Sequence, residues 1–176
     1  FVGTKVWSQP EVFRPIPQPG QFLNYIECKR QFLNSLQSDL RRYVLYRPYD
    51  RSTTNFNERK YFAESIPWVK FLSGNLHTKL LKSRLCVMDH LGTTLMLALA
   101  ANVPVIAFWN KLHWPVDPKA APYFKNLEDA GILYDGPSKA ATQVNEVWSN
   151  TEEWWQSPKI QKARLGWRDQ FAKTHR

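Results

Sequence analysis

Residues 84–110 read RLCVMDHLGTTLMLALAANVPVIAFWN, and the order of their apolar and polar segments decides the fold. An apolar run is followed by a short polar turn centred on Gly92, Thr93 and Thr94, then by an apolar stretch of helical length and a second apolar run. This order predicts strand, loop, helix and strand. Such a turn puts hydroxyl groups and free backbone N–H groups where a helix begins at the edge of a parallel sheet, a common position for bound phosphate.

The rest of the chain continues the alternation of strands and helices. Apolar runs predict further strands over residues 4–8, 43–46, 68–72, 104–109 and 132–134. Helical periods and end signals predict helices over residues 21–42, 76–83, 118–130, 138–148, 151–155 and 157–173, and residues 52–66 are expected to be irregular or partly helical. Uninterrupted apolar strands separated by helices are typical of a parallel sheet covered on both faces. The predicted fold class is α/β: a Rossmann-like three-layer sandwich with a mostly parallel sheet and a helical C-terminus.

Residue types at the expected helix ends support these bounds. Asn75, Ser138 and Asn150 are suited to cap the first turn of a helix, because their side chains accept from backbone N–H groups. Pro158 fits the first helical turn, and Gly131 fits the left-handed position that follows a helix end.

Length and composition favour a single domain. The 176 residues are 43% hydrophobic and 14% aromatic, which is enough to bury a core. No stretch reaches the roughly 20 apolar residues of a membrane span, and the opening FVGTKVWSQP lacks the pattern of a signal peptide, so we expect a cytoplasmic chain. The two cysteines, Cys28 and Cys86, are far apart in the sequence. We expect no disulfide, no metal and no cofactor.

The charge balance predicts an anionic partner. The chain has 24 Lys and Arg against 15 Asp and Glu, a formal net charge of +9. This excess fits nucleic acid, an anionic membrane surface met peripherally at the inner membrane, or a phosphorylated small molecule. The basic residues are scattered, as on solvated helix faces, and the tryptophans of the expected C-terminal helices have the spacing of core residues. Specific nucleic-acid binding is therefore the weakest of these alternatives.

Residues 88–110, MDHLGTTLMLALAANVPVIAFWN, resemble the C-terminal donor-binding half of two-domain glycosyltransferases of the GT-B fold. The shared pattern is an Asp, a turn of small and hydroxyl residues, a Leu-rich helix and then Asn-x-Pro-x-Ile-x-Phe-Trp. It is most similar to surface-carbohydrate transferases of the lipopolysaccharide and capsule type, and more loosely to CDP-glycerol glycerophosphotransferases. The resemblance implies a nucleotide-sugar, or similar nucleotide-activated, donor bound at the carboxyl ends of the strands.

Donor phosphates need N–H groups, hydroxyls and cations. The resemblance implies that Gly92, Thr93 and Thr94 contact these phosphates. Gly92 allows close approach of the backbone, and the two threonines are expected to cap the helix and to offer hydroxyls. The alternative is a helix cap without a ligand. Arg47, at the end of an earlier strand, is a further phosphate candidate, with pairing to Asp50 as the alternative.

The donor sugar or base is expected to contact side chains that follow two neighbouring strands. Asp89 and His90 follow the first of them, and each has a purely structural role as its alternative. Trp109 and Asn110 close the second, where an aromatic face stacks on bases and sugar rings. A packed loop is the alternative for this pair.

Domain organisation follows from the size of the chain. A complete GT-B enzyme has two Rossmann-like halves, and residues 1–176 have room for one. We therefore expect a single Rossmann-like domain that forms the C-terminal half of a longer protein, with the acceptor site and the catalytic base on a missing N-terminal acceptor domain. The family's ribose-binding Glu is absent from LMLALAAN, residues 95–102, which favours the alternative of a non-catalytic binding module.

Overall fold

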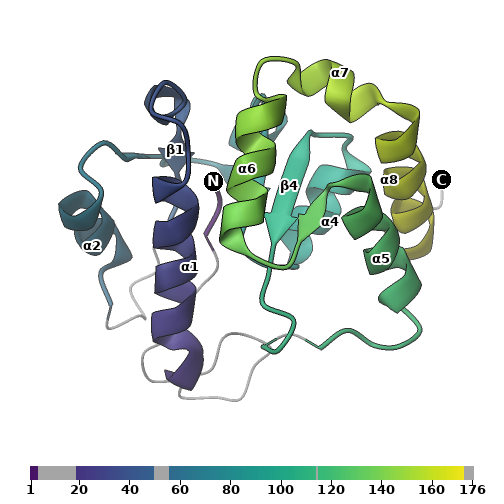
Figure 1. The fold of residues 1–176 in the computed structure, drawn as a ribbon, viewed down its shortest axis with the longest axis horizontal. Helices are drawn as coiled ribbons and strands as arrows, with labels where there is room; N and C mark the ends of the chain where they lie inside the picture. The colour runs from purple at the N-terminus through teal and green to yellow at the C-terminus, as the bar shows by residue number, and fades with distance from the viewer. Residues whose placement is uncertain (4–18, 50–55, 114, 173–176) are drawn as a thin grey trace.

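The computed structural model describes residues 1–3, 19–49, 56–113 and 115–172 (Figure 1). The strand expected over residues 4–8 lies outside these ranges, as does Asp50.

The strands are short and run parallel. β3 (Cys86–Met88), β4 (Val105–Phe108) and β5 (Leu133–Tyr134) form one sheet in that order. β1 (Leu45–Tyr46) and β2 (Lys70–Phe71) form a second parallel pair. The strands predicted within the described residues are thus present, although each is shorter than its apolar run.

The first three residues lie between the two sheets. Val2 makes a parallel bridge to Arg47, just after β1, and another to Met88 of β3. The strand order across the molecule is therefore β2, β1, residues 1–3, β3, β4 and β5.

Helices cover both faces of this arrangement (Figure 1). The α-helices are α1 (Phe22–Asn34), α2 (Glu58–Ser65), α3 (Leu76–Leu81), α4 (Thr93–Ala100), α5 (Ala121–Ala130), α6 (Pro137–Val147), α7 (Thr151–Gln156) and α8 (Pro158–Phe171), and short 3-10 turns cover Pro19–Gln21 and Arg41–Tyr43. Among the described helices, none is both long and apolar enough to cross a membrane.

The side chains of β4 show why two helical layers are needed. Val105 and Ala107 belong to a core cluster with residues of α4, α5 and α8, whereas Ile106 and Phe108 belong to a second cluster with residues of α1 and α6. All four are buried, because successive side chains of a strand point to opposite faces. The α/β fold with parallel strands and a helical C-terminus is confirmed.

The first long helix is shorter than predicted. Its apolar period continues to residue 40, but α1 ends at Asn34 with Ser35 as its C-cap. Leu36 and Leu40 are nevertheless buried, at 3% and 6% exposure, in the turns that follow. Tertiary packing rather than helix formation therefore explains the last part of this period.

The predicted helix ends are confirmed in part. Asn75 accepts a hydrogen bond from the first turn of α3, and Gly131 has the left-handed φ of +85° after α5. Ser138 is not a cap, because Gly136 occupies the N-cap position of α6. Asn150 is the N-cap residue of α7, but its side chain makes no capping bond.

Replacing Gly131 by alanine should lower the free energy of unfolding by about 1 kcal/mol, because an L-residue is strained in the left-handed region. A Cβ there would also lie 3.2 Å from Oη of Tyr134. Urea unfolding measures the change. Gly166→Ala, within α8 and with no atom near the added Cβ, is the matched control and should slightly stabilise the protein. Equal stabilities of the two variants would contradict this assignment.

Candidate functional site

The candidate site lies at the carboxyl ends of the parallel strands. Asp89 and His90 come directly after β3, and Gly92 precedes the first residue of α4. The connection between strand and helix is therefore only four residues long, which brings these side chains next to the start of α4.

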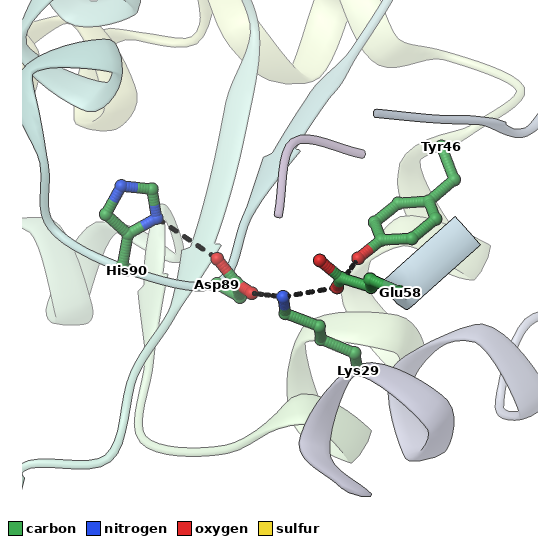
Figure 2. Close-up of polar contacts among 5 residues, drawn as sticks. All are labelled: Lys29, Tyr46, Glu58, Asp89 and His90. Carbon is green, nitrogen blue, oxygen red and sulfur yellow. Dashed lines mark hydrogen bonds and ion pairs between the residues drawn. The ribbon is translucent and has the colours of Figure 1, made fainter. Parts of the chain in front are cut away.

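A chain of buried polar groups runs under this connection (Figure 2). Lys29 on α1 places its Nζ 2.6 Å from Oε1 of Glu58 on α2 and 3.5 Å from Oδ2 of Asp89. The hydroxyl of Tyr46 on β1 donates to the same oxygen of Glu58. Two helices, β1 and the residue after β3 are thus joined by one chain of polar contacts.

The ammonium of Lys29 is balanced by two carboxylates. Its side chain is fully buried, and those of Glu58 and Asp89 are 9% and 1% exposed. Burial by itself lowers the pKa of Lys29, but the two carboxylates outweigh burial and raise this pKa above its usual value. Lys29 is therefore charged at neutral pH.

Asp89 also holds the ring of His90. Nδ1 of His90 lies 3.1 Å from Oδ1 of Asp89, and the His90 side chain is 16% exposed. A carboxylate in this position favours the tautomer whose proton is on Nδ1, which leaves Nε2 as an acceptor while the ring is neutral. Asp89 thus orients an imidazole that can accept or carry a proton.

Gly92 is required by the position of that imidazole. A Cβ on Gly92 would lie 2.5 Å from Nε2 of His90, closer than any real contact of this kind. Gly92 has an extended conformation, with φ of −91° and ψ of −175°, so its φ does not demand glycine. Sequence analysis linked this glycine to phosphate; the structure adds that the ring of His90 leaves no room for a side chain.

The start of α4 has no side-chain cap. Gly92 is the N-cap residue, and Thr93 and Thr94 are the first two residues of the helix. The expectation that these threonines cap the helix is wrong, because both lie inside it. The side chain of Thr93 is exposed and that of Thr94 is half-buried. The first turn therefore offers hydroxyls and N–H groups that no capping side chain occupies.

Arg47 lies at the same edge of the sheet, and its side chain bonds to the loop after β2. Arg47 and Met88 flank Val2 in register, so two strand spacings, about 10 Å, separate their backbones. Nη1 of Arg47 donates to the carbonyl of Gly74 at 2.6 Å, in the loop after β2. In the structure this guanidinium is therefore bonded to the loop after β2.

Trp109 and Asn110 both stabilise the loop after β4. Trp109 is 3% exposed and packs against Phe124, with a ring-centroid distance of 5.2 Å. Oδ1 of Asn110 accepts from the N–H of Leu112 at 2.9 Å, and its amide donates to Oδ1 of Asn24 on α1 at 3.5 Å. Asn110 is only half-buried, whereas the indole of Trp109 belongs to the core.

Sequence analysis missed Lys29, Glu58 and Tyr46, although one signal pointed to the lysine. Lys29 falls on the apolar stripe of α1, at helical spacing from Ile26 and Leu33, where a lysine is not expected unless it is paired. Its partners could not be found in this way, because they lie 29 and 60 residues further along the chain.

Replacing Lys29 by methionine should lower the free energy of unfolding by roughly 3–5 kcal/mol, because two buried carboxylates would lose their counter-ion. Chemical denaturation at neutral pH measures this loss. The matched control is Lys159→Met on α8, where the lysine is exposed and the change should be within about 0.5 kcal/mol.

Wild type and Lys29→Met also test how the charge of Lys29 contributes to stability at different pH values. A lysine whose pKa is raised by folding stabilises the protein below its unfolded pKa of about 10.4 and loses that contribution as pH rises through the folded pKa. The stability gap between wild type and Lys29→Met should therefore narrow above about pH 10. A gap that is small at neutral pH, or unchanged in alkali, would contradict the proposed role of Lys29.

Gly92→Ala should displace the ring of His90 and break its hydrogen bond to Asp89, because the added Cβ overlaps Nε2. Imidazole NMR signals report the loss as a changed tautomer of His90. Gly136→Ala is the matched control: Gly136 is also an N-cap glycine, and a Cβ there meets no atom. His90 signals that are the same in both variants would rule out this packing.

The family of this chain follows from a comparison with protein-family models. The model described as LIC12162 family transferase matches residues 1–176, so the chain belongs to this family of transferases. No match was found among curated proteins or among solved structures.

Proposed function

Starting from this membership of a transferase family, we propose that the chain binds a nucleotide-activated sugar between the end of β3 and the start of α4. In this proposal it is the donor-binding domain of a glycosyltransferase in surface polysaccharide biosynthesis. The observation that carries the proposal is the uncapped first turn of α4 beside the Asp89–His90 pair, at the carboxyl edge of parallel strands.

The diphosphate of such a donor would bind at the first turn of α4. The positive end of a helix dipole attracts an anion, with a contribution of about 0.3–1 kcal/mol. The exposed hydroxyl of Thr93 and that of Thr94 would donate to phosphate oxygens, together with N–H groups of this turn. The first turn of α4 contains no acidic residue that would repel the phosphates of the donor.

His90 would contact the phosphates of the donor. Its Nε2 lies beside Gly92, and a ring nitrogen that carries a proton donates a hydrogen bond to a phosphate oxygen. Asp89 keeps the ring in place through Nδ1 in either protonation state. Lys29 in turn fixes Asp89 from the core. We therefore propose that His90 stabilises the leaving nucleotide by a hydrogen bond and does not act as a nucleophile.

The remaining predicted residues take smaller parts in this proposal. Asn110 would face the sugar or the base from the loop after β4, and Trp109 would support that loop from the core. Arg47 would join the site only if its bond to Gly74 were exchanged for a phosphate.

The acceptor and the general base are assigned to another domain. The described residues form two parallel sheets with helices on both faces, and in this proposal they are one half of a two-domain transferase. We propose that an N-terminal acceptor domain completes the enzyme. Binding of the donor, rather than transfer, is then the activity that residues 1–176 should retain alone.

Isothermal titration against UDP-, GDP-, CDP- and CMP-linked sugars tests the proposal. We expect one class of donor to bind and the Thr93→Ala/Thr94→Ala variant to lose about tenfold or more in affinity, the equivalent of one hydrogen bond to a charged group. Thr142→Ala, at an exposed position on α6, is the control and should bind as wild type does.

Two outcomes would overturn the proposal. One is the absence of binding by every donor to a folded protein. The other is binding that the two threonine substitutions leave unchanged, particularly if it also falls steeply with salt and extends to nucleic acid.

A further inference from the structure

Glu58 is the first residue of α2, and its side chain is buried although this helix lies at an edge of the molecule (Figure 1). The residue is 8% exposed, and glutamates are rarely buried to this extent unless they are paired. Asn57 caps the first turn of α2 by accepting from the N–H of Lys60, so the helix does not need Glu58 as a cap. The Glu58 carboxylate is directed inward instead, to Lys29 and Tyr46 (Figure 2).

The ammonium of Lys29 contacts Glu58 more closely than it contacts Asp89. Nζ donates to Oε1 of Glu58 at 2.6 Å, but it lies 3.5 Å from Oδ2 of Asp89, which is longer than a charge-assisted hydrogen bond normally is. The backbone limits its movement, because a Cβ on Gly3 would lie 3.2 Å from Nζ and 2.7 Å from Oη of Tyr46. Glu58 thus holds the ammonium where it neutralises the charge of Asp89 only in part.

The charges along this chain of contacts alternate in sign. The carboxylates of Glu58 and Asp89 and the ammonium of Lys29 sum to one negative charge beside the ring of His90. In the proposed donor complex the ring donates from Nδ1 to Asp89 and from Nε2 to a phosphate, so it carries one positive charge there. The four groups are then neutral together. Without the charge of Glu58, the ammonium would neutralise Asp89 and leave the ring without a counter-charge.

We propose that Glu58 is a positioning residue of the donor site, which acts on His90 through Lys29 and Asp89. This inference rests on the proposed function, and it adds α2 to the elements on which donor binding depends. Coupling between two parts of a protein is reciprocal. A bound donor therefore stabilises the packed position of α2 by the same factor by which the packed helix strengthens donor binding.

Glu58→Gln tests this role, because it removes the charge but keeps the size of the side chain and an oxygen that accepts hydrogen bonds. Phe62, also on α2, is fully buried and packs against Tyr46 with a ring-centroid distance of 5.2 Å, so the helix should stay in place. Titration with the donor class that wild type binds should show a loss of affinity of about fivefold or more. Imidazole NMR signals, recorded without a ligand, should show a weaker hydrogen bond from Nδ1 of His90 to Asp89.

Glu64→Gln is the matched control. It makes the same chemical change at an exposed position of the same helix, so its donor affinity and its His90 signals should equal those of wild type. A second measurement needs no substitution. Amide hydrogen exchange over residues 61–65 of α2 should slow about fivefold or more when wild type is saturated with the donor, because the coupling acts in both directions.

A donor that binds wild type and Glu58→Gln with equal affinity would overturn the role of Glu58 and leave the donor site in place. If Glu58→Gln does not fold, unchanged exchange of the α2 amides in donor-bound wild type overturns the role instead. Absence of binding by every donor would overturn the proposed function, and the His90 signals of the ligand-free proteins then decide on Glu58 separately. Signals that are identical in Glu58→Gln and Glu64→Gln overturn the positioning role in either case.

Discussion

One buried ammonium group joins three parts of the chain that also share an apolar core cluster. Lys29 pairs with Glu58 and Asp89, and these contacts bring α1, α2 and the end of β3 together. A buried ion pair adds little net stability, because desolvation costs about as much as the attraction returns. An arrangement that separated Lys29 from its carboxylates would leave a buried charge unpaired, which costs several kcal/mol, so the ion pairs favour this arrangement of the elements. The geometry of the candidate site follows from this arrangement.

The two carboxylate oxygens of Asp89 contact different partners at the edge of the sheet. One carboxylate oxygen faces Lys29 in the core, and the other faces His90 at the surface. The ring of His90 then occupies the space beside Gly92, the N-cap residue of α4. If this transferase binds an anion here, buried charged groups rather than exposed side chains would hold the polar groups of the site in position. This is the kind of support that keeps polar groups oriented before a ligand arrives.

Local signals were sufficient where local forces decide the structure. The apolar runs of β3 and β4 predicted buried strands, Asn75 predicted a helix start, and Gly131 predicted a helix end; all are confirmed. Predictions were less accurate where a distant contact decides. Leu36 and Leu40 continue the hydrophobic period of α1, but they lie in the turns after the helix. Their side chains are nevertheless buried in the core. Hydrophobic periodicity reports burial, and burial does not specify backbone conformation.

The sequence by itself determined the α/β class, the parallel strands and the polar turn from Asp89 to Thr94, because these depend on residues close together in the chain. Only the tertiary structure decided which groups Asp89 contacts, why position 92 has no room for a side chain, and that Arg47 bonds to Gly74. These features depend on distances between residues far apart in the sequence. Periodicity and end signals carry no information about such distances, whereas the packing of helices against the sheet sets them directly.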